Sequence, residues 1–130
     1  MFNHIMVGSN DIEKSKTFYK AVLGTLGFTG DPVEDVKDGF TRHFYIHDGS
    51  VFCVTQPIDG QTATPGNGTT YGFRCTSPEQ VKAFHDAGVA NGGTSIEDPP
   101  GARQTNMGEV HLSYVRDPDG NKLCGLYRAG

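Results

Sequence analysis

The feature of this sequence that most restricts its fold is an internal repeat. When the chain is shifted by 66 residues, residues 4–28 lie on residues 70–94, with identical residues at five of 25 positions. Both segments begin with a short apolar run and continue with a helix-start pattern. At a shift of 71 residues, an Asp-Gly pair and a cysteine also coincide: Asp48, Gly49 and Cys53 match Asp119, Gly120 and Cys124. The sequence therefore predicts two copies of one unit that differ in the length of a loop.

The first copy predicts a strand, a helix and three further strands. Asn10 and Glu13 have the spacing of a capping box, which begins a helix, and two glycines three residues apart end the helical apolar spacing. The Asp48-Gly49 pair predicts a hairpin turn between the last two strands. The predicted strands cover residues 2–7, 32–38, 40–47 and 50–56.

The second copy repeats this order. Ser77 is the predicted helix N-cap, with Pro78 at the first helical position and Gln80 completing the capping box. Arg103 lies in a predicted long loop that begins at the proline pair 99–100. The last two strands are predicted to form a hairpin about the sequence Asp-Pro-Asp-Gly. The predicted strands cover residues 69–75, 94–98, 109–116 and 121–127.

Length and charge restrict the function classes. We expect a single domain over residues 1–130, with a first module at about 1–57, a linker at about 58–68 and a second module at about 69–130. A net charge of −4 and a pI near 5.6 argue against nucleic acid or a membrane as a partner held by charge. The apolar stretches are short and no signal-peptide pattern is recognised, so we expect a cytoplasmic location. Three cysteines, an odd number, fit reduced thiols.

The paired units resemble the vicinal oxygen chelate superfamily, which includes glyoxalase I, bleomycin-resistance proteins and extradiol dioxygenases. The resemblance covers the whole chain and rests on "DIEKSKTFY" after the first strand and "RDPDGNKL" before the last. It implies an α+β fold in which two βαβββ repeats form a cupped mixed β-sheet with the helices on the outside. It also implies a homodimer, because in small members two subunits usually complete two such cups.

The resemblance implies four metal-ligand positions on the inner wall of the cup. They fall on His4, Cys53, Thr70 and Cys124, where the family usually has histidine or glutamate. A divalent ion at such a seat acts as a Lewis acid on substrate oxygens. Glyoxalase I activity is not expected, because neither glutamate position keeps the carboxylate that serves as general base.

The residues leave three functions open. The first is a small-molecule-binding protein whose metal seat is degenerate. The second is a lyase, isomerase or dioxygenase with zinc, iron, manganese or nickel at His4, Cys53 and Cys124, a donor set of imidazole and thiolates that suits a soft ion. The third is a metal-free enzyme in which His4 or another histidine of the pocket is the general base. Whether the chain is an enzyme stays open at this point, and a pocket without a metal is the favoured reading.

Strand alternation predicts further residues in the binding pocket. It places Met6 on the face of His4, Thr55 on the face of Cys53, and Arg74 on the face of Thr70. Arg74 could hold a carboxylate in bidentate fashion, or it could pair with an acidic neighbour. Arg103 could cover the pocket from its loop. The histidines outside the first strand are expected to be exposed or structural, and His85 is expected to be a solvated side chain on the second helix.

Overall fold

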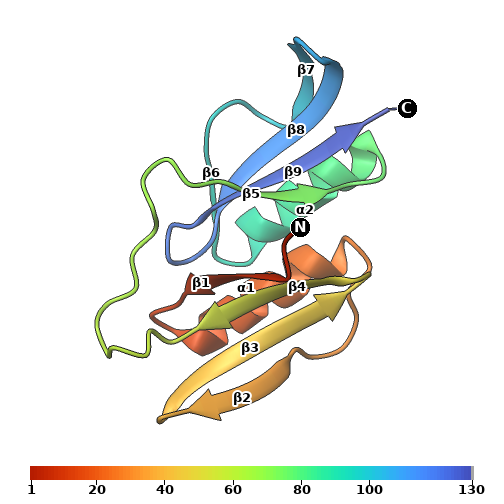
Figure 1. The fold of residues 1–130 in the computed structure, drawn as a ribbon. Helices are drawn as coiled ribbons and strands as arrows, with labels where there is room; N and C mark the ends of the chain where they lie inside the picture. The colour runs from red at the N-terminus through yellow and green to blue at the C-terminus, as the bar shows by residue number, and fades with distance from the viewer. Residues whose placement is uncertain (130) are drawn as a thin grey trace.

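The repeat predicted from the sequence is present in the computed structural model, which describes residues 1–129 (Figure 1). The fold is α+β. The first copy consists of β1 (His4–Gly8), α1 (Ile12–Gly24), β2 (Val33–Lys37), β3 (Phe40–His47) and β4 (Ser50–Thr55). The second consists of β5 (Tyr71–Arg74), α2 (Pro78–Ala90), β6 (Thr94–Ser95), β7 (Gly101–Thr105), β8 (Gly108–Arg116) and β9 (Lys122–Arg128).

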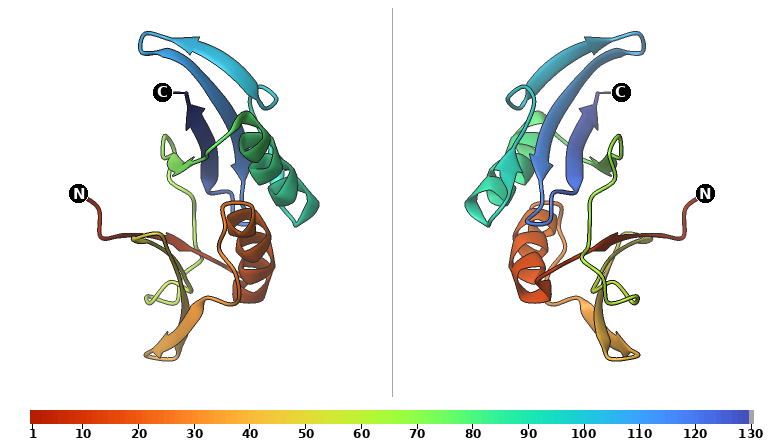
Figure 2. Two further views of the ribbon diagram at one scale, coloured as in Figure 1. Left: turned by 90° about the vertical axis from the view of Figure 1, so that its right-hand side faces the viewer. Right: turned by 90° about the vertical axis from the view of Figure 1, so that its left-hand side faces the viewer.

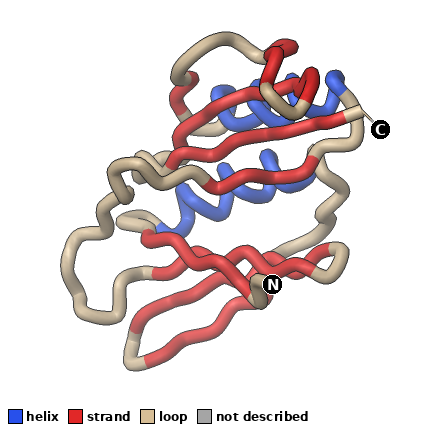
Figure 3. The backbone as a smooth tube through the Cα atoms, turned by 45° about the horizontal axis from the view of Figure 1, so that its top comes forward, coloured by secondary structure: helices blue, strands red, loops and turns tan. Residues whose placement is uncertain are grey.

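Each copy forms its own mixed sheet, and neither sheet is closed (Figure 3). The first has the order β1-β4-β3-β2, and the second has the order β5-β9-β8-β6, with β7 also paired to β8. The pairs β1-β4 and β5-β9 are parallel, whereas the other pairs are antiparallel. The helices pack against each other and lie on one side of the two sheets (Figure 2). Neither helix in the described chain is long and apolar enough to cross a membrane.

The start of α1 differs from the prediction by one residue. Asp11, not Asn10, is the N-cap, and its carboxylate accepts the Lys14 backbone N–H. Asn10 is instead held by the linker, because its side chain both donates to and accepts from the backbone of Ala63, at 3.0 and 2.7 Å. The predicted capping box with Glu13 is therefore wrong, since a tertiary contact takes the side chain that would have formed it.

The N-cap and the first turn of α2 follow the prediction, but the Gln80 side chain accepts the backbone N–H of Thr76 and not that of Ser77, as the predicted capping box would require. The Ser77 hydroxyl accepts the Gln80 backbone N–H at 3.1 Å, and Pro78 occupies the first turn, where the backbone N–H that proline lacks would have no partner within the helix.

Further along α2, Gly88 allows the two helices to approach each other closely. A Cβ at Gly88 would lie 3.2 Å from the Phe18 ring and 3.0 Å from Val115.

The second copy departs from the predicted strand pattern between α2 and β8. The strand predicted over residues 94–98 is reduced to β6, and the predicted loop around Arg103 contains β7 instead. β7 turns into β8 at residues 106–107, where the Thr105 hydroxyl donates to the Gly108 carbonyl at 2.7 Å and Gly108 has a φ of +98°. The polar sequence "GARQT" carries little apolar alternation, so this strand forms by pairing with β8 and not through its own pattern.

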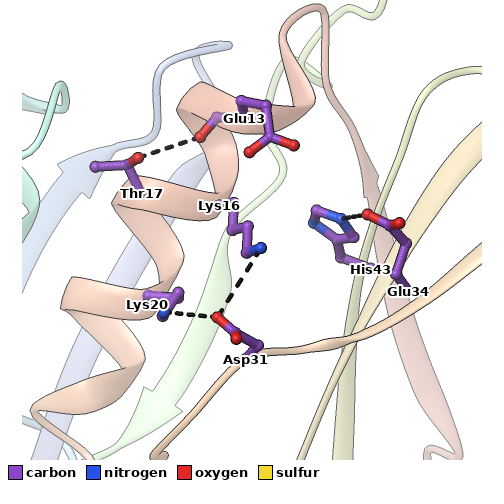
Figure 4. Close-up of polar contacts among 7 residues, drawn as sticks. All are labelled: Glu13, Lys16, Thr17, Lys20, Asp31, Glu34 and His43. Carbon is purple, nitrogen blue, oxygen red and sulfur yellow. Dashed lines mark hydrogen bonds and ion pairs between the residues drawn. The ribbon is translucent and has the colours of Figure 1, made fainter.

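Polar contacts in the first module hold the segment before β2 against α1 and join β2 to β3 (Figure 4). Lys20 and Lys16 on α1 pair with Asp31, at 2.6 and 3.9 Å. His43 on β3 is 1 % exposed, and its Nε2 lies 2.9 Å from the Glu34 carboxylate on β2. The lysine pairs therefore tie α1 to the segment that leads into β2, and the histidine contact ties β3 to β2.

The apolar core lies between the helices and the sheets. Phe18, Tyr19 and Val22 on α1 are fully buried, and Phe84 on α2 is the corresponding residue of the second module. Aromatic contacts cross between the modules at Phe52 of β4, whose ring centroid lies 5.3 Å from that of Phe73 on β5. β1 and β5 are therefore edge strands that face each other across the middle of the molecule (Figure 1).

Residues 117–121, the turn between β8 and β9, join the two modules through polar contacts, of which those of Asp117 are buried; we call these residues the inter-module turn. The Tyr19 hydroxyl on α1 donates to Asp117 Oδ2 at 2.5 Å, and the Asn10 backbone N–H donates to Asp119 Oδ1 at 2.8 Å. The Asn121 side-chain amide donates to Asp117 Oδ2 at 2.9 Å. The last hairpin of the chain thus binds the first helix.

Burial dominates the electrostatics of this contact. It raises the pKa of the Asp117 carboxyl, an effect that hydrogen bonds from Tyr19 and Asn121 oppose in part. The pKa of Tyr19 is raised well above its usual value by burial and by the negative charge of Asp117. Because the pKa of Asp117 is higher in the folded than in the unfolded chain, the protonated carboxyl favours folding. This contribution to the free energy of unfolding is complete below the ordinary carboxyl pKa of about 4 and is lost as the pH rises through the folded-state pKa.

We expect Tyr19→Phe to lower the free energy of unfolding by about 1–3 kcal/mol at pH 7, because it removes a hydrogen bond from a buried carboxylate. The loss should be smaller at pH 4, where protonation relieves the unpaired charge. Urea unfolding followed by circular dichroism measures both values. Tyr127→Phe is the control, because no partner of the Tyr127 hydroxyl is present among residues 1–129. Equal losses in the two variants would contradict this account of the inter-module turn.

Candidate functional site

A groove of about 550 Å³ lies between the two modules, where the end of α1 and the start of α2 meet the facing edges of the sheets; we call it the seam groove. Its wall is mainly apolar and comes from both modules. The apolar lining residues are Phe2, Ile5, Leu23, Leu26, Phe28, Tyr45, Val51, Phe52, Tyr71 and Phe73. A concave, largely apolar site with a few polar groups is the usual form of a small-molecule site.

The seam groove is open because the two hairpins of the repeat differ in length. The turn between β3 and β4 has two residues, 48–49, whereas the inter-module turn has five, 117–121. Asp48 and Gly49 have φ of 50° and 79°, the left-handed values of a tight hairpin turn. Such a short turn lines the groove without closing it.

The helix starts of the two copies show the same difference. Asn10 and Thr76 are equivalent under the 66-residue shift, yet the Asn10 N–H binds Asp119 and the Thr76 N–H binds the Gln80 side chain at 2.6 Å. Gln80 also donates from Nε2 to the Thr25 carbonyl at 2.9 Å, which joins α2 to the end of α1. The second helix start is therefore satisfied from within its own neighbourhood, and no turn residue occupies the adjacent space.

Polar side chains stand on the rim of the seam groove. Arg74 at the end of β5 is exposed, and the structure of residues 1–129 gives its guanidinium no hydrogen-bond or ion-pair partner. An acidic neighbour, the alternative considered from the sequence, does not pair with it in that part of the chain. His4 lies on the same rim, with its Nδ1 2.7 Å from Asn3 Oδ1. The remaining polar lining comes from Asn3, His47, Asp48, Ser50, Thr76 and Gln80.

The structure brings together only some of the residues predicted for the site. His4 and Arg74 line the seam groove, whereas Thr70 lines a separate hollow beside the linker. Met6, Cys53 and Thr55 share the face of the first sheet opposite α1, where Met6 is the cross-strand partner of Cys53. Cys124 lies on the corresponding face of the second sheet, beside Tyr114, and Arg103 lies on β7.

The four positions carried over from the family do not provide a matching metal donor set within one chain. Among the described residues, no three His, Cys, Asp or Glu side chains come together in a way that could hold a metal ion. Burial also raises the pKa of the Cys53 and Cys124 thiols, which opposes the thiolate form that a metal requires. We therefore derive no chemistry from a metal at these positions.

The sequence missed the aromatic wall and misplaced one histidine. Tyr45, Phe52 and Phe73 lie on the helix-facing side of their strands, which alternation assigns to the core. His85 is not solvated as predicted: it is 9 % exposed and its Nε2 lies 2.7 Å from the Ser95 hydroxyl on β6.

Comparison with known proteins identifies the family. Residues 1–124 match the Glyoxalase/Bleomycin resistance protein/Dioxygenase superfamily. The chain belongs to this superfamily. The match confirms the resemblance inferred from the repeat and from the inter-module turn. No curated protein matches the chain.

Solved structures of the superfamily have the same fold. A glyoxalase/bleomycin resistance protein from Albidiferax ferrireducens T118 is 55% identical, with a TM-score of 0.90 over 98% of this chain and 99% of that one. A glyoxalase-related enzyme from Fulvimarina pelagi is 21% identical, with a TM-score of 0.72 over 98% and 88% of the two chains. A family enzyme from Burkholderia phytofirmans PsJN is 17% identical, with a TM-score of 0.65 over 96% of each chain. The last two comparisons show the fold alone.

We expect the three thiols of this superfamily member to react slowly while it is folded. Cys53, Cys75 and Cys124 are 0, 3 and 5 % exposed, and burial raises the pKa of Cys75 to about 11. Because the thiolate is the reactive form, native thiols at pH 8 should react with Ellman's reagent at least about a hundredfold more slowly than free cysteine. Unfolding in guanidinium should release all three. A native thiol that reacts at the rate of free cysteine would contradict the described burial.

Proposed function

We propose that this glyoxalase/bleomycin-resistance-family protein binds a small organic molecule in the seam groove without needing a metal, because its metal seat is degenerate. The single observation that carries the proposal is the groove itself, about 550 Å³ with an aromatic wall and an unpaired Arg74 on its rim. Sequestering or sensing a ligand is the activity that such a site supports.

The wall and the rim together favour an aromatic molecule with an anionic group. Phe28, Tyr71 and Phe73 are only partly buried and offer ring faces and edges, against which a flat apolar ligand can stack. Arg74 offers a planar guanidinium that binds a carboxylate through two parallel hydrogen bonds. His47 and His4 lie on the same rim and add hydrogen-bond donors.

The proposal includes a homodimer, as the family resemblance implies. Exposed apolar side chains support a second copy on the face of the first sheet that no helix of the described chain covers. Val33, Ile46 and Met6 stand on that face, with exposures of 57, 57 and 37 %. Sedimentation equilibrium should give twice the chain mass, and a monomer at high micromolar concentration would contradict this part of the proposal.

The seam-groove proposal predicts binding of 2-naphthoate, an aromatic carboxylate, by the wild-type protein. The ligand should raise the melting temperature, because it binds the folded chain alone. Arg74→Gln should weaken the affinity about tenfold or more, since it removes a charge-assisted hydrogen bond. Isothermal titration calorimetry measures the affinity, and a saturating chelator should leave it unchanged.

Two controls separate the seam groove from general effects of charge. Arg128→Gln removes the same charge from an exposed position outside the groove, and should leave the affinity unchanged. The neutral analogue 2-naphthalenemethanol should bind more weakly than 2-naphthoate to the wild type and about equally to Arg74→Gln. If 2-naphthoate gives no melting shift at millimolar concentration, or if both arginine variants lose equal affinity, the proposal is wrong.

The geometry of His4 favours a second candidate, a metal-free enzyme. The 2.7 Å contact to Asn3 Oδ1 fits Nδ1 as the donor, which leaves Nε2 as a free base on the rim of the groove. A bound molecule with an acidic C–H could lose its proton there. Turnover that survives chelation and falls about a hundredfold or more in His4→Gln would support this candidate. The candidate would be opposed if His4→Gln leaves the ligand affinity unchanged and the bound ligand takes up no deuterium from deuterated water.

A further inference from the structure

A second hollow, of about 530 Å³, lies beside the linker and shares no lining residue with the seam groove. It is bounded by residues 65–70 on one side and by the end of the second hairpin on the other. The hairpin contributes Arg116, Gly120 and Lys122. Thr70, which occupies one of the family's metal-ligand positions, is part of this wall.

The hollow is lined by positively charged side chains, whereas the net charge of the chain is negative. Arg116 and Lys122 are direct cross-strand partners, so their side chains leave the same face of the second sheet. The described lining includes no aspartate or glutamate, although the net charge of the protein is −4. Two cations on one wall without a lining carboxylate favour an anion.

The linker side of the hollow is shaped by close contacts. The Thr69 N–H donates to the Gly66 carbonyl at 3.2 Å, which closes a turn, and Gly68 within it has a φ of +90°. A Cβ at Gly66 would lie 2.4 Å from Thr69 Oγ1, so a larger residue there would have to displace the Thr69 side chain. Among the backbone N–H groups of residues 66–69, the described structure gives a partner only to Thr69.

The hairpin side is also held in place. Arg116 Nη1 donates to the Gly120 carbonyl at 2.6 Å, which uses one of its five N–H groups. Pro65 packs on Gly120, where an added Cβ would lie 3.2 Å from the proline ring. Linker and hairpin therefore keep a fixed spacing, and the remaining guanidinium donors of Arg116 stay available.

Lys122 has one competing partner. Its ammonium group forms an ion pair with Glu97 and lies 4.7 Å from the centroid of the Tyr114 ring. Glu97 is not part of the hollow's lining and about half of its side chain is exposed, so water screens this pair. An anion in the hollow would compete with Glu97 for Lys122.

We propose that this hollow is a binding site for an oxyanion of a small molecule, either a phosphate or a carboxylate, held by Arg116, Lys122 and the turn at residues 66–69. Guanidinium and ammonium groups bind both kinds of oxyanion through charge-assisted hydrogen bonds, and free backbone N–H groups in a turn add to such a site. The site is independent of the seam groove, so neither proposal depends on the other.

The test is a titration of the wild-type protein with inorganic phosphate and, separately, with acetate, at constant ionic strength in chloride. Two-dimensional NMR should show amide shifts of Gly66, Gly68 and Thr69 that saturate with one or both anions. Lys122→Gln should weaken binding about tenfold, because it removes one charge-assisted contact. Glu97→Gln should strengthen it several-fold, because it frees the ammonium group of Lys122. Arg116→Lys keeps the charge but loses the planar fork, and should weaken binding of whichever oxyanion saturates the wild-type protein.

Lys14→Gln is the matched control, since Lys14 is an exposed lysine on α1 outside both hollows. It should leave the titration unchanged. Saturation with phosphate alone would identify a phosphate site, and saturation with acetate alone a carboxylate site. Shifts that do not saturate with either anion, or that are reduced equally in Lys14→Gln and Lys122→Gln, would overturn the proposal. A weaker response in Glu97→Gln than in the wild type would also overturn it.

Discussion

The buried hydrogen bond between Tyr19 and Asp117 is the interaction on which the placement of the two modules depends. It connects the first helix to the last hairpin across 98 residues of sequence, in a region where a carboxylate without a partner is strongly disfavoured. Asp119 and Asn121 add contacts to the chain just before the same helix. These polar groups satisfy one another in a single arrangement, so they hold the two modules rigidly together at the start of α1. No equivalent turn holds the modules together at the start of α2.

The functional surface follows from the difference between the copies, not from what they share. A five-residue turn fills the space at the start of α1, whereas a two-residue turn leaves the space at the start of α2 open as the seam groove. The same asymmetry separates the charges. Arg116 and Lys122 occupy the base of the second hairpin, and Ile46 and Val51 hold the comparable strand positions in the first. The two copies share one fold, and the differences between their turns and strand residues make the two halves chemically different.

Local sequence signals predicted most of the fold, because caps, turns and strand alternation act over a few residues. The Ser77 cap and both hairpins are examples. The errors arose where residues distant in sequence make the contact. Asn10 does not cap α1 because its side chain hydrogen-bonds to the backbone of Ala63, and His85 is not solvated because it packs against β6. Of the residues that line the seam groove, His4 was predicted from the family resemblance and Arg74 from strand alternation. The aromatic wall was not predicted, because a ring that faces a helix gives the same sequence pattern whether another ring or a cavity covers it.

The two unclosed sheets leave strands whose backbone could pair with another molecule. The inner edges, β1 and β5, face each other within one chain, so each shields its counterpart. The outer strand β2 has no such cover from the described chain, and it follows Pro32 and carries Glu34, Asp35 and Lys37. Charged side chains beside a proline are a common defence of exposed strands against strand addition. In a protein built from two unclosed sheets, such an outer edge opposes strand-by-strand assembly into fibrils.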